Sequence, residues 1–134
     1  MMRLPVLYVC DLLEDNEELM KAINDNSECI FAVDVDEEYK KGEMLPIIRV
    51  NQVSGNQSVF ASGVPNYYSI VIQVDVWDEK FGTIEPFHTL LDKIFIKDGW
   101  VCITSILDKD SEFDNKPRLI KRYKKNQYIK TEFI

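Results

Sequence analysis

The chain has 134 residues and a mass of 15.7 kDa, the size of one domain spanning residues 1–134. Because 46% of its residues are hydrophobic, it can bury a core, which excludes wholesale disorder. No apolar run approaches the roughly 18 residues of a membrane span, so no membrane partner is expected. The sequence start lacks the apolar core of a signal peptide, and the three scattered cysteines, Cys10, Cys29 and Cys102, suit buried thiols better than disulfides. These features predict a cytosolic protein.

The net charge of -7 is unevenly distributed along the chain. Residues 1–44 carry a net charge of -8, with 12 acidic and 4 basic side chains, whereas residues 112–134 carry +4, with 3 acidic and 7 basic side chains. The acidic bulk argues against nucleic-acid binding by the whole surface. The two ends are predicted either to complement each other between neighbouring subunits or simply to keep a small domain soluble.

The first third of the chain predicts one or two helices followed by a strand. Apolar residues recur over residues 4–20, and Asp15 and Asn16 offer a cap at which a second helix can begin. Residues 29–33 are a candidate strand. The acidic run 34–43 is predicted to be a solvated connection rather than a calcium loop, because it lacks the spacing of calcium ligands.

A strand over residues 45–53 is followed by a segment rich in Ser, Gly and Asn, residues 54–66. This composition predicts a mobile loop that joins two strands of a hairpin. Val59 and Phe60 are apolar residues within this polar segment. They indicate either a contact surface for a partner or side chains that fold back onto their own domain.

The stretch 67–99 has the clearest pattern in the sequence. Residues 67–77 alternate as a strand with an apolar row on one face (Tyr68, Ile70, Ile72, Val74 and Val76) and a second face that carries Tyr67, Ser69, Val71, Gln73, Asp75 and Trp77. A turn at 78–82 precedes a helix over 84–97, with Thr83 as its expected N-cap. The helix has one apolar stripe, formed by Ile84, Phe87, Leu90, Leu91, Ile94 and Phe95. Gly99 is predicted to end it in the left-handed conformation.

The remainder predicts a strand over 100–107, an acidic turn over 108–116 and a final strand or hairpin over 118–131, with a possible bend at 124–127. The connections between adjacent strands are too short for helical crossovers. The expected fold is therefore α+β, a mostly antiparallel sheet with two main helices packed on one face.

Catalytic and metal-binding patterns are not found. His88, the single histidine, falls on the polar side of the predicted helix and is expected to be exposed. No Cys-x-x-Cys or His-x-x-x-His spacing is present, and the acidic pairs suit turns and solvated faces. The sequence predicts a protein that is not an enzyme and binds no cofactor or metal.

A basic run near the carboxyl terminus contains Lys121, Arg122, Lys124 and Lys125, with Tyr123 and Tyr128 interleaved. Such a run can bind phosphate weakly. Contact with an acidic protein surface is the more economical interpretation, given the acidic chain.

The order of elements resembles tail terminator (tail completion, or minor tail) proteins of long-tailed bacteriophages. The resemblance is carried by the segment Gln73-Val74-Asp75-Val76-Trp77, the helix over 84–97, Gly99-Trp100 with the strand that follows, the opening helix with Leu12-Leu13, the strand at 45–53 and the closing strand.

The resemblance implies a virion subunit that is assembled in the host bacterial cytoplasm as a six-membered ring on the head-proximal end of the tail tube. There it would stop polymerisation of the major tail tube protein and dock the head-completion protein, with DNA passing through its lumen without specific contacts. Another neck, connector or tail-tube subunit and a small cytosolic adaptor module are the alternatives. Tyr67, Gln73, Asp75 and Trp77 are predicted to face a neighbouring subunit, so that Trp77→Ala would weaken assembly more than folding.

Overall fold

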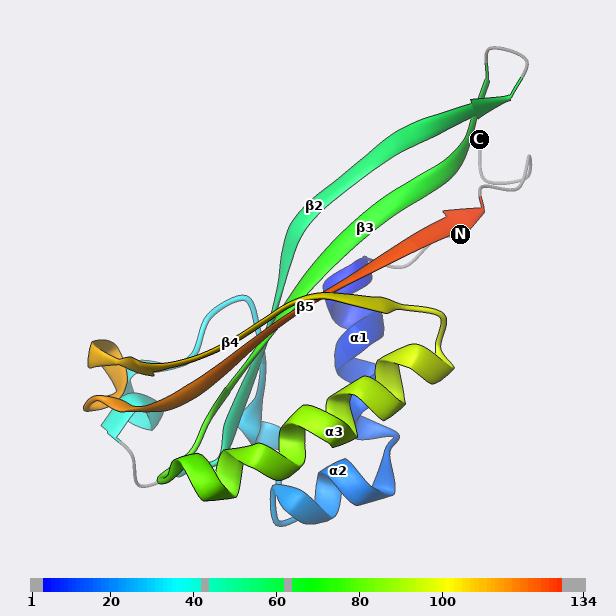
Figure 1. Cartoon of the computed structure of the whole chain (residues 1–134). Helices are drawn as coiled ribbons and strands as arrows, with labels where there is room; N and C mark the ends of the chain where they lie inside the picture. Colours follow the sequence, from blue (N-terminus) through cyan, green and yellow to red (C-terminus); the bar gives the residue numbers. More distant parts are fainter. Residues whose placement is uncertain (1–3, 42–43, 62–63, 129–134) are drawn as a thin grey trace.

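The computed structural model describes residues 4–41, 44–61 and 64–128, and the side chains of these residues except 27, 41, 55–61, 64–68 and 127–128. Five strands form one sheet in the order β1-β2-β3-β5-β4 (Figure 1). The elements are α1 (Pro5–Glu14), α2 (Glu17–Ala22), η1 (Ser27–Cys29), β1 (Ile30–Ala32), η2 (Glu37–Lys41), β2 (Ile47–Ala61), β3 (Val64–Trp77), α3 (Phe81–Lys97), β4 (Val101–Asp110), η3 (Ser111–Phe113) and β5 (Lys116–Tyr128). β1 pairs with β2 in parallel, and the other three pairs are antiparallel. The predicted α+β fold with a mostly antiparallel sheet is confirmed.

The amino-terminal helical region is two helices rather than one. Asn16 separates them, and its side chain accepts a hydrogen bond from the backbone N–H of Leu19 at 2.9 Å, as an N-cap residue does. Leu13 of α1 and Leu19 of α2 are both fully buried in the main core. The break lets both short helices turn their apolar residues towards the sheet, Val9 and Leu13 from α1 and Leu19 from α2.

Strands β2 and β3 form one long hairpin that extends well beyond the helices (Figure 1). The predicted hairpin is confirmed, but the loop predicted over 54–66 is wrong in its extent, because backbone pairing continues to Ala61 opposite Val64 and leaves only residues 62–63 outside the described residues. Ser, Gly and Asn disfavour strands locally, but the ladder to β3 overrides that preference. The segment rich in Ser, Gly and Asn instead contains register shifts in its pairing with β3, between Gln52 and Ser54 and again around Val59.

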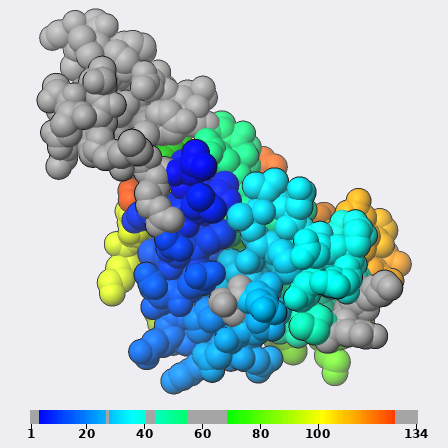
Figure 2. All heavy atoms as spheres, turned by 180° about the vertical axis from the view of Figure 1, so that it is seen from behind, coloured from blue at the N-terminus to red at the C-terminus, as the bar shows by residue number. Residues whose placement is uncertain are grey.

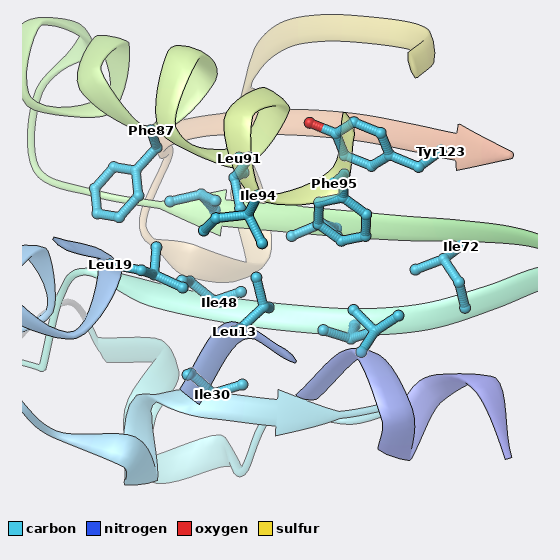
Figure 3. Close-up of a cluster of buried hydrophobic side chains, with 14 of the residues drawn as sticks. Leu13, Leu19, Ile30, Ile48, Ile72, Phe87, Leu91, Ile94, Phe95 and Tyr123 are labelled. Carbon is cyan, nitrogen blue, oxygen red and sulfur yellow. The ribbon is translucent and has the colours of Figure 1, made fainter. Parts of the chain in front are cut away.

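The main core lies between the sheet and the helices. Ile70, Ile72, Val74 and Val76 of β3 point towards α3 and are at most 3% exposed. The helical stripe meets them, and Phe95 stacks on Tyr123 of β5 with ring centroids 4.0 Å apart (Figure 3). The predicted apolar row and helical stripe are confirmed for the described side chains, with Leu90 partly buried.

Several boundaries differ from the expected ones: β2 begins at Ile47 rather than 45, β4 continues to Asp110 rather than 107, and β5 begins at Lys116 rather than 118. α3 begins at Phe81 rather than after Thr83, and the Thr83 hydroxyl instead accepts from the Lys80 N–H at 3.3 Å within the first turn. β5 is one continuous strand through 124–127, where a bend was predicted, because its pairing with β3 continues from Arg118 to Tyr128. The change at the start of α3 comes from a local contact within its first turn, and the continuity of β5 comes from pairing with β3, which is distant in sequence.

α3 ends at Gly99 as predicted, with a φ of +92°. The Gly99 N–H donates to the carbonyl of Ile96 at 3.0 Å, and the Trp100 N–H donates to that of Phe95 at 2.9 Å. This is the Schellman motif, and the expected apolar contact is made by the rings of Phe95 and Trp100, with centroids 5.8 Å apart.

Two glycines, Gly82 in the first turn of α3 and Gly99 just after its end, provide a matched test. Gly99→Ala should lower the free energy of unfolding by about 1–2 kcal/mol, because a Cβ is strained at positive φ. Gly82→Ala meets no atom within 4 Å and should be neutral or stabilising by up to about 1 kcal/mol, because alanine favours helix. Urea unfolding followed by circular dichroism measures both. Equal effects of the two substitutions would contradict the helix end described here.

Candidate functional site

Trp77 lies inside the protein rather than on a face offered to a neighbour. It is fully buried, stacks on Phe113 with ring centroids 4.1 Å apart, and donates from Nε1 to Asp110 Oδ2 at 3.0 Å. With Val35 and Ile47 it forms a second core on the side of the sheet opposite the helices. The prediction that Trp77 contacts a neighbouring subunit is wrong, because η3 and the connection after β1 fold over this end of the sheet.

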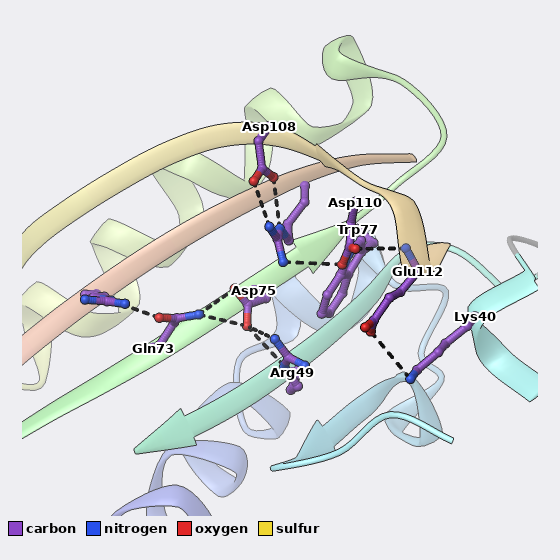
Figure 4. A network of polar contacts seen from close by, with 10 residues as sticks. Lys40, Arg49, Gln73, Asp75, Trp77, Asp108, Asp110 and Glu112 are labelled. Carbon is purple, nitrogen blue, oxygen red and sulfur yellow. Dashed lines mark hydrogen bonds and ion pairs between the residues drawn. The ribbon is translucent and has the colours of Figure 1, made fainter. Parts of the chain in front are cut away.

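Asp75 is also fully buried, and its carboxylate is satisfied within the chain. Arg49 donates to Asp75 Oδ2 from Nε at 3.1 Å and from Nη2 at 2.8 Å, and Gln73 donates to Oδ1 at 3.0 Å (Figure 4). Gln73 is half-buried and accepts at Oε1 from Arg122 Nε at 2.9 Å. Asp75 is therefore corrected from an interface residue to a buried acceptor, and Gln73 is held by neighbours on both sides.

The same face carries a second group of paired charges, at the end of β4. Arg118 binds Asp108 through two hydrogen bonds of 2.9 and 2.7 Å and approaches Asp110 at 3.3 Å. The hydrogen bond and charge of Arg118 lower the pKa of the Asp108 carboxyl below its ordinary value. We call the set of Arg49, Gln73, Asp75, Asp108, Asp110, Arg118 and Arg122 the open-face network. Its charges are mostly matched within the chain.

The basic run does not form one surface, because successive residues of β5 point to opposite faces of the sheet. Arg122 and Lys124 lie on the open face, with Lys124 exposed. Lys121 points towards α3 and is fully buried, and Lys125 lies 3.4 Å from Asp98 and over the rings of Tyr8 and Trp100. The prediction of one contact surface formed by all four cations is wrong, because they lie on two faces of the sheet. Lys121, being buried, is unavailable to any partner.

Lys121 is the centre of a polar cluster under α3. Its ammonium group donates to Asp92 Oδ1 at 2.6 Å and lies 2.9 Å from His88 Nδ1, while the Tyr123 hydroxyl donates to the same Asp92 oxygen at 2.6 Å. Burial alone would raise the pKa of Asp92, but the hydrogen bonds from Lys121 and Tyr123 and the lysine charge leave it below its ordinary value. Burial and Asp92 raise the pKa of Tyr123. His88 itself is exposed, as predicted.

Three predicted contact residues, Val59, Phe60 and Tyr67, have side chains outside the described residues. Their backbones belong to the hairpin, where Val59 is opposite Tyr67 and Phe60 is opposite Pro65. Tyr67 also pairs with Tyr128 of β5. Their assignment as contact residues stays a prediction.

The sequence reasoning missed the surface along β4. This strand is outermost in the sheet, and four of its apolar side chains are about half exposed or more: Val101 63%, Ile103 51%, Ile106 49% and Leu107 53%. A groove of about 410 Å³ lies beside it, lined by Leu107 and Leu119 from the sheet and by residues of α3 that include Phe81 and Glu85. The available signal was the run 99–107, nine residues without a charge in a chain that is 29% charged.

The described part of the chain contains no candidate metal centre, because no three His, Cys, Asp or Glu side chains are grouped there as a metal ion would require. The thiols of Cys10, Cys29 and Cys102 are free, and burial, with Glu14 and Asp11 nearby, raises the pKa of Cys10 to about 11. None of the described helices is both long and apolar enough to cross a membrane.

No model of a known protein family matches the chain. No curated protein matches it at a significant level either. A functional assignment consequently depends on the pattern of elements in the sequence and on the surfaces described above.

Replacing Trp77 tests its position in the second core. Trp77→Ala should lower the free energy of unfolding by about 3–5 kcal/mol, because it leaves a cavity against Phe113 and an unpaired Asp110 oxygen. Val53→Ala, at a half-exposed site in β2, is the control and should change stability by less than about 0.5 kcal/mol. Chemical denaturation measures both, and a Trp77→Ala protein as stable as the wild type would contradict the burial.

The Asp92 cluster predicts a dependence of stability on pH. Since the folded-state pKa of Asp92 lies below its unfolded value of about 3.9, its contribution is present above that pH and is lost as the pH falls through the folded pKa. Asp92→Asn should cost about 1.5–3 kcal/mol at pH 6, and its difference from the wild type should shrink towards pH 3.

Glu38→Gln, which removes one exposed acid from η2, is the matched control for the loss of a negative charge. Urea titrations at a series of pH values between 6 and 3 give the comparison. A gap between Asp92→Asn and wild type that stays constant over this range would contradict the ionised cluster.

Proposed function

We propose that the chain is a structural subunit of a bacteriophage tail, a tail terminator that forms a six-membered ring on the head-proximal end of the tail tube. In this role it stops polymerisation of the major tail tube protein and docks the head-completion protein. It would belong to the virion tail after assembly in the host bacterial cytoplasm, with DNA passing its lumen without sequence-specific contacts.

The observation that carries this proposal is the uncovered outer strand β4. A domain of 134 residues that leaves four apolar side chains of one edge strand about half exposed has a surface suited to another polypeptide. The resemblance in element order supplies the kind of assembly, and the α+β fold agrees with it. A ring subunit also needs two different contact surfaces, because each copy meets one neighbour on each side.

A structural rather than a catalytic role is part of the proposal. Among the described residues, the two fully buried charged side chains, Lys121 and Asp75, are paired inside the chain with Asp92 and Arg49. Such pairs fix side chains in one arrangement. Rigid surfaces of this kind suit a subunit that must present the same face to every neighbour.

A tube-length assay tests the proposed function. The major tail tube subunit of a long-tailed bacteriophage is polymerised with and without the protein, and tube lengths are measured by electron microscopy. Tubes that stop growing and carry a cap are expected, because a terminator blocks the growing end. Light scattering of the free or tube-released cap should give about 94 kDa, the mass of six 15.7 kDa chains.

Tubes of unchanged length without bound protein would contradict the proposal. Binding along the whole tube, without a change in length, would favour another tail or neck subunit instead. Bovine serum albumin at the same concentration controls for non-specific effects on polymerisation.

A further inference from the structure

The first seven residues of β4, 101–107, lack the charges or prolines that usually protect an exposed sheet edge. Such edges present unpaired backbone N–H and C=O groups, and natural proteins shield them with charges, prolines or a covering element. The run 99–107 contains neither a charged residue nor a proline. A register shift between Cys102 and Thr104 interrupts the ladder to β5, but it leaves Ile103 half exposed. An edge of this composition is suited to pairing with another strand.

Apolar groups are available on both faces of this edge. Ile106 lies opposite Ile120 on the open face, and Leu107 lies opposite Leu119 on the helix face, beside the groove to which Phe81 contributes. A strand that adds to β4 would therefore bury side chains on both sides of the extended sheet. Strand addition of this kind combines backbone hydrogen bonds with alternate side-chain pockets.

The surroundings of β4 carry free positive charge. Lys109 lies near the end of the strand, and Lys124 of β5 is opposite Val101 at its start. Both are exposed, and neither has a carboxylate partner among the described residues. Two nearby acids are bound within the chain, since Asp98 accepts from Lys125 and Asp108 accepts from Arg118, whereas Glu85 beside the groove is exposed.

The opposite edge of the sheet carries free negative charge. β1 is the outermost strand there, and Glu28 and Asp34 stand just before and just after it. Segment 24–38 contains 6 acidic residues and no basic one. The amino-terminal third, to which this segment belongs, makes up most of the face shown in Figure 2. Glu28 and Asp34 are exposed and lack a cationic partner in the described part of the chain.

We propose that β4 of one copy docks head to tail against β1 and the acidic segment 24–38 of a second copy of this chain. Lysines at both ends of β4 then face acids at both ends of β1, and the charge-free centre of β4 is covered. The contact joins two different surfaces, so repetition closes a ring when the rotation allows it. This inference rests on the ring of the proposed function and assigns the surfaces that build it.

Charge-swap variants test the contact. The β4 variant carries Lys109→Glu and Lys124→Glu, and the β1 variant carries Glu28→Lys and Asp34→Lys. Each alone should assemble at least tenfold more weakly than the wild type at low salt, because like charges meet across the contact. A one-to-one mixture should assemble again, since every contact in an alternating ring then joins opposite charges.

Lys21→Glu and Glu17→Lys, at exposed positions of α2, are matched controls for charge reversal and should leave assembly unchanged. Ile103→Lys together with Ile106→Lys tests the apolar part and should also reduce assembly, without recovery in the mixture. Circular dichroism establishes that each variant is folded. Light scattering and sedimentation equilibrium at 50 mM and 500 mM salt give the association state.

Each outcome separates this contact from the proposed function. Wild-type-like rings from both charge variants overturn the contact but leave the tube assay untouched. Assembly lost in the β4 variant and retained in the β1 variant indicates β4-to-β4 pairing and also overturns it. A wild type that is monomeric at millimolar concentration and low salt overturns it in favour of a foreign strand on β4. Recovery in the mixture without tube capping supports the contact and refutes the terminator role.

Discussion

The rest of the fold depends on one constraint: both faces of β3 are buried at its carboxyl end, so each face needs cover and partners for its polar groups. Val74, Asp75, Val76 and Trp77 are successive residues, and all four are fully buried. Alternation sends the two valines towards α3 and the other two residues to the opposite side. The opposite side therefore needs its own cover, which η3 and the connection after β1 provide around Trp77. It also needs compensation for a buried carboxylate, which Arg49 and Gln73 provide through hydrogen bonds to Asp75.

This requirement leaves the edges, rather than the faces, for contacts with other molecules. In the body of the domain one face is covered by helices, and the open-face network and the second core occupy much of the other. Since β3 is paired to β2 on one side and β5 on the other, the unpaired backbone of the described sheet lies along β1 and β4 and along the parts of β2 and β5 that extend past them. β4 is the longer of the two outermost strands, with ten residues against three in β1, and its apolar side chains are the more exposed.

Local patterns were sufficient to predict the α+β class, the two periodicities of 67–99 and the end of α3 at Gly99, because each depends on neighbours in sequence. The burial of Trp77 was missed because Phe113, its stacking partner, is 36 residues away and belongs to a turn. The strand over 54–61 was missed because its pairing with β3 outweighs the turn preference of Ser, Gly and Asn. Strand alternation alone places Lys121 and Arg122 on opposite faces of the sheet, although their residue types suggest one basic surface.

The electrostatic argument for assembly therefore moves from the carboxyl-terminal segment to the β4 edge. The +4 charge of residues 112–134 is largely used within the chain, since Lys116 pairs with Glu79, Arg118 with Asp108 and Lys121 with Asp92. The acids of segment 24–38 are compensated much less, with Glu37 bound to Lys40. Ion pairs inside the fold thus neutralise most of the positive charge that the sequence suggested for contact with an acidic surface of a neighbouring subunit. Lys109 and Lys124 remain as exposed cations without a carboxylate partner in the described residues, and they lie at the two ends of the uncovered strand.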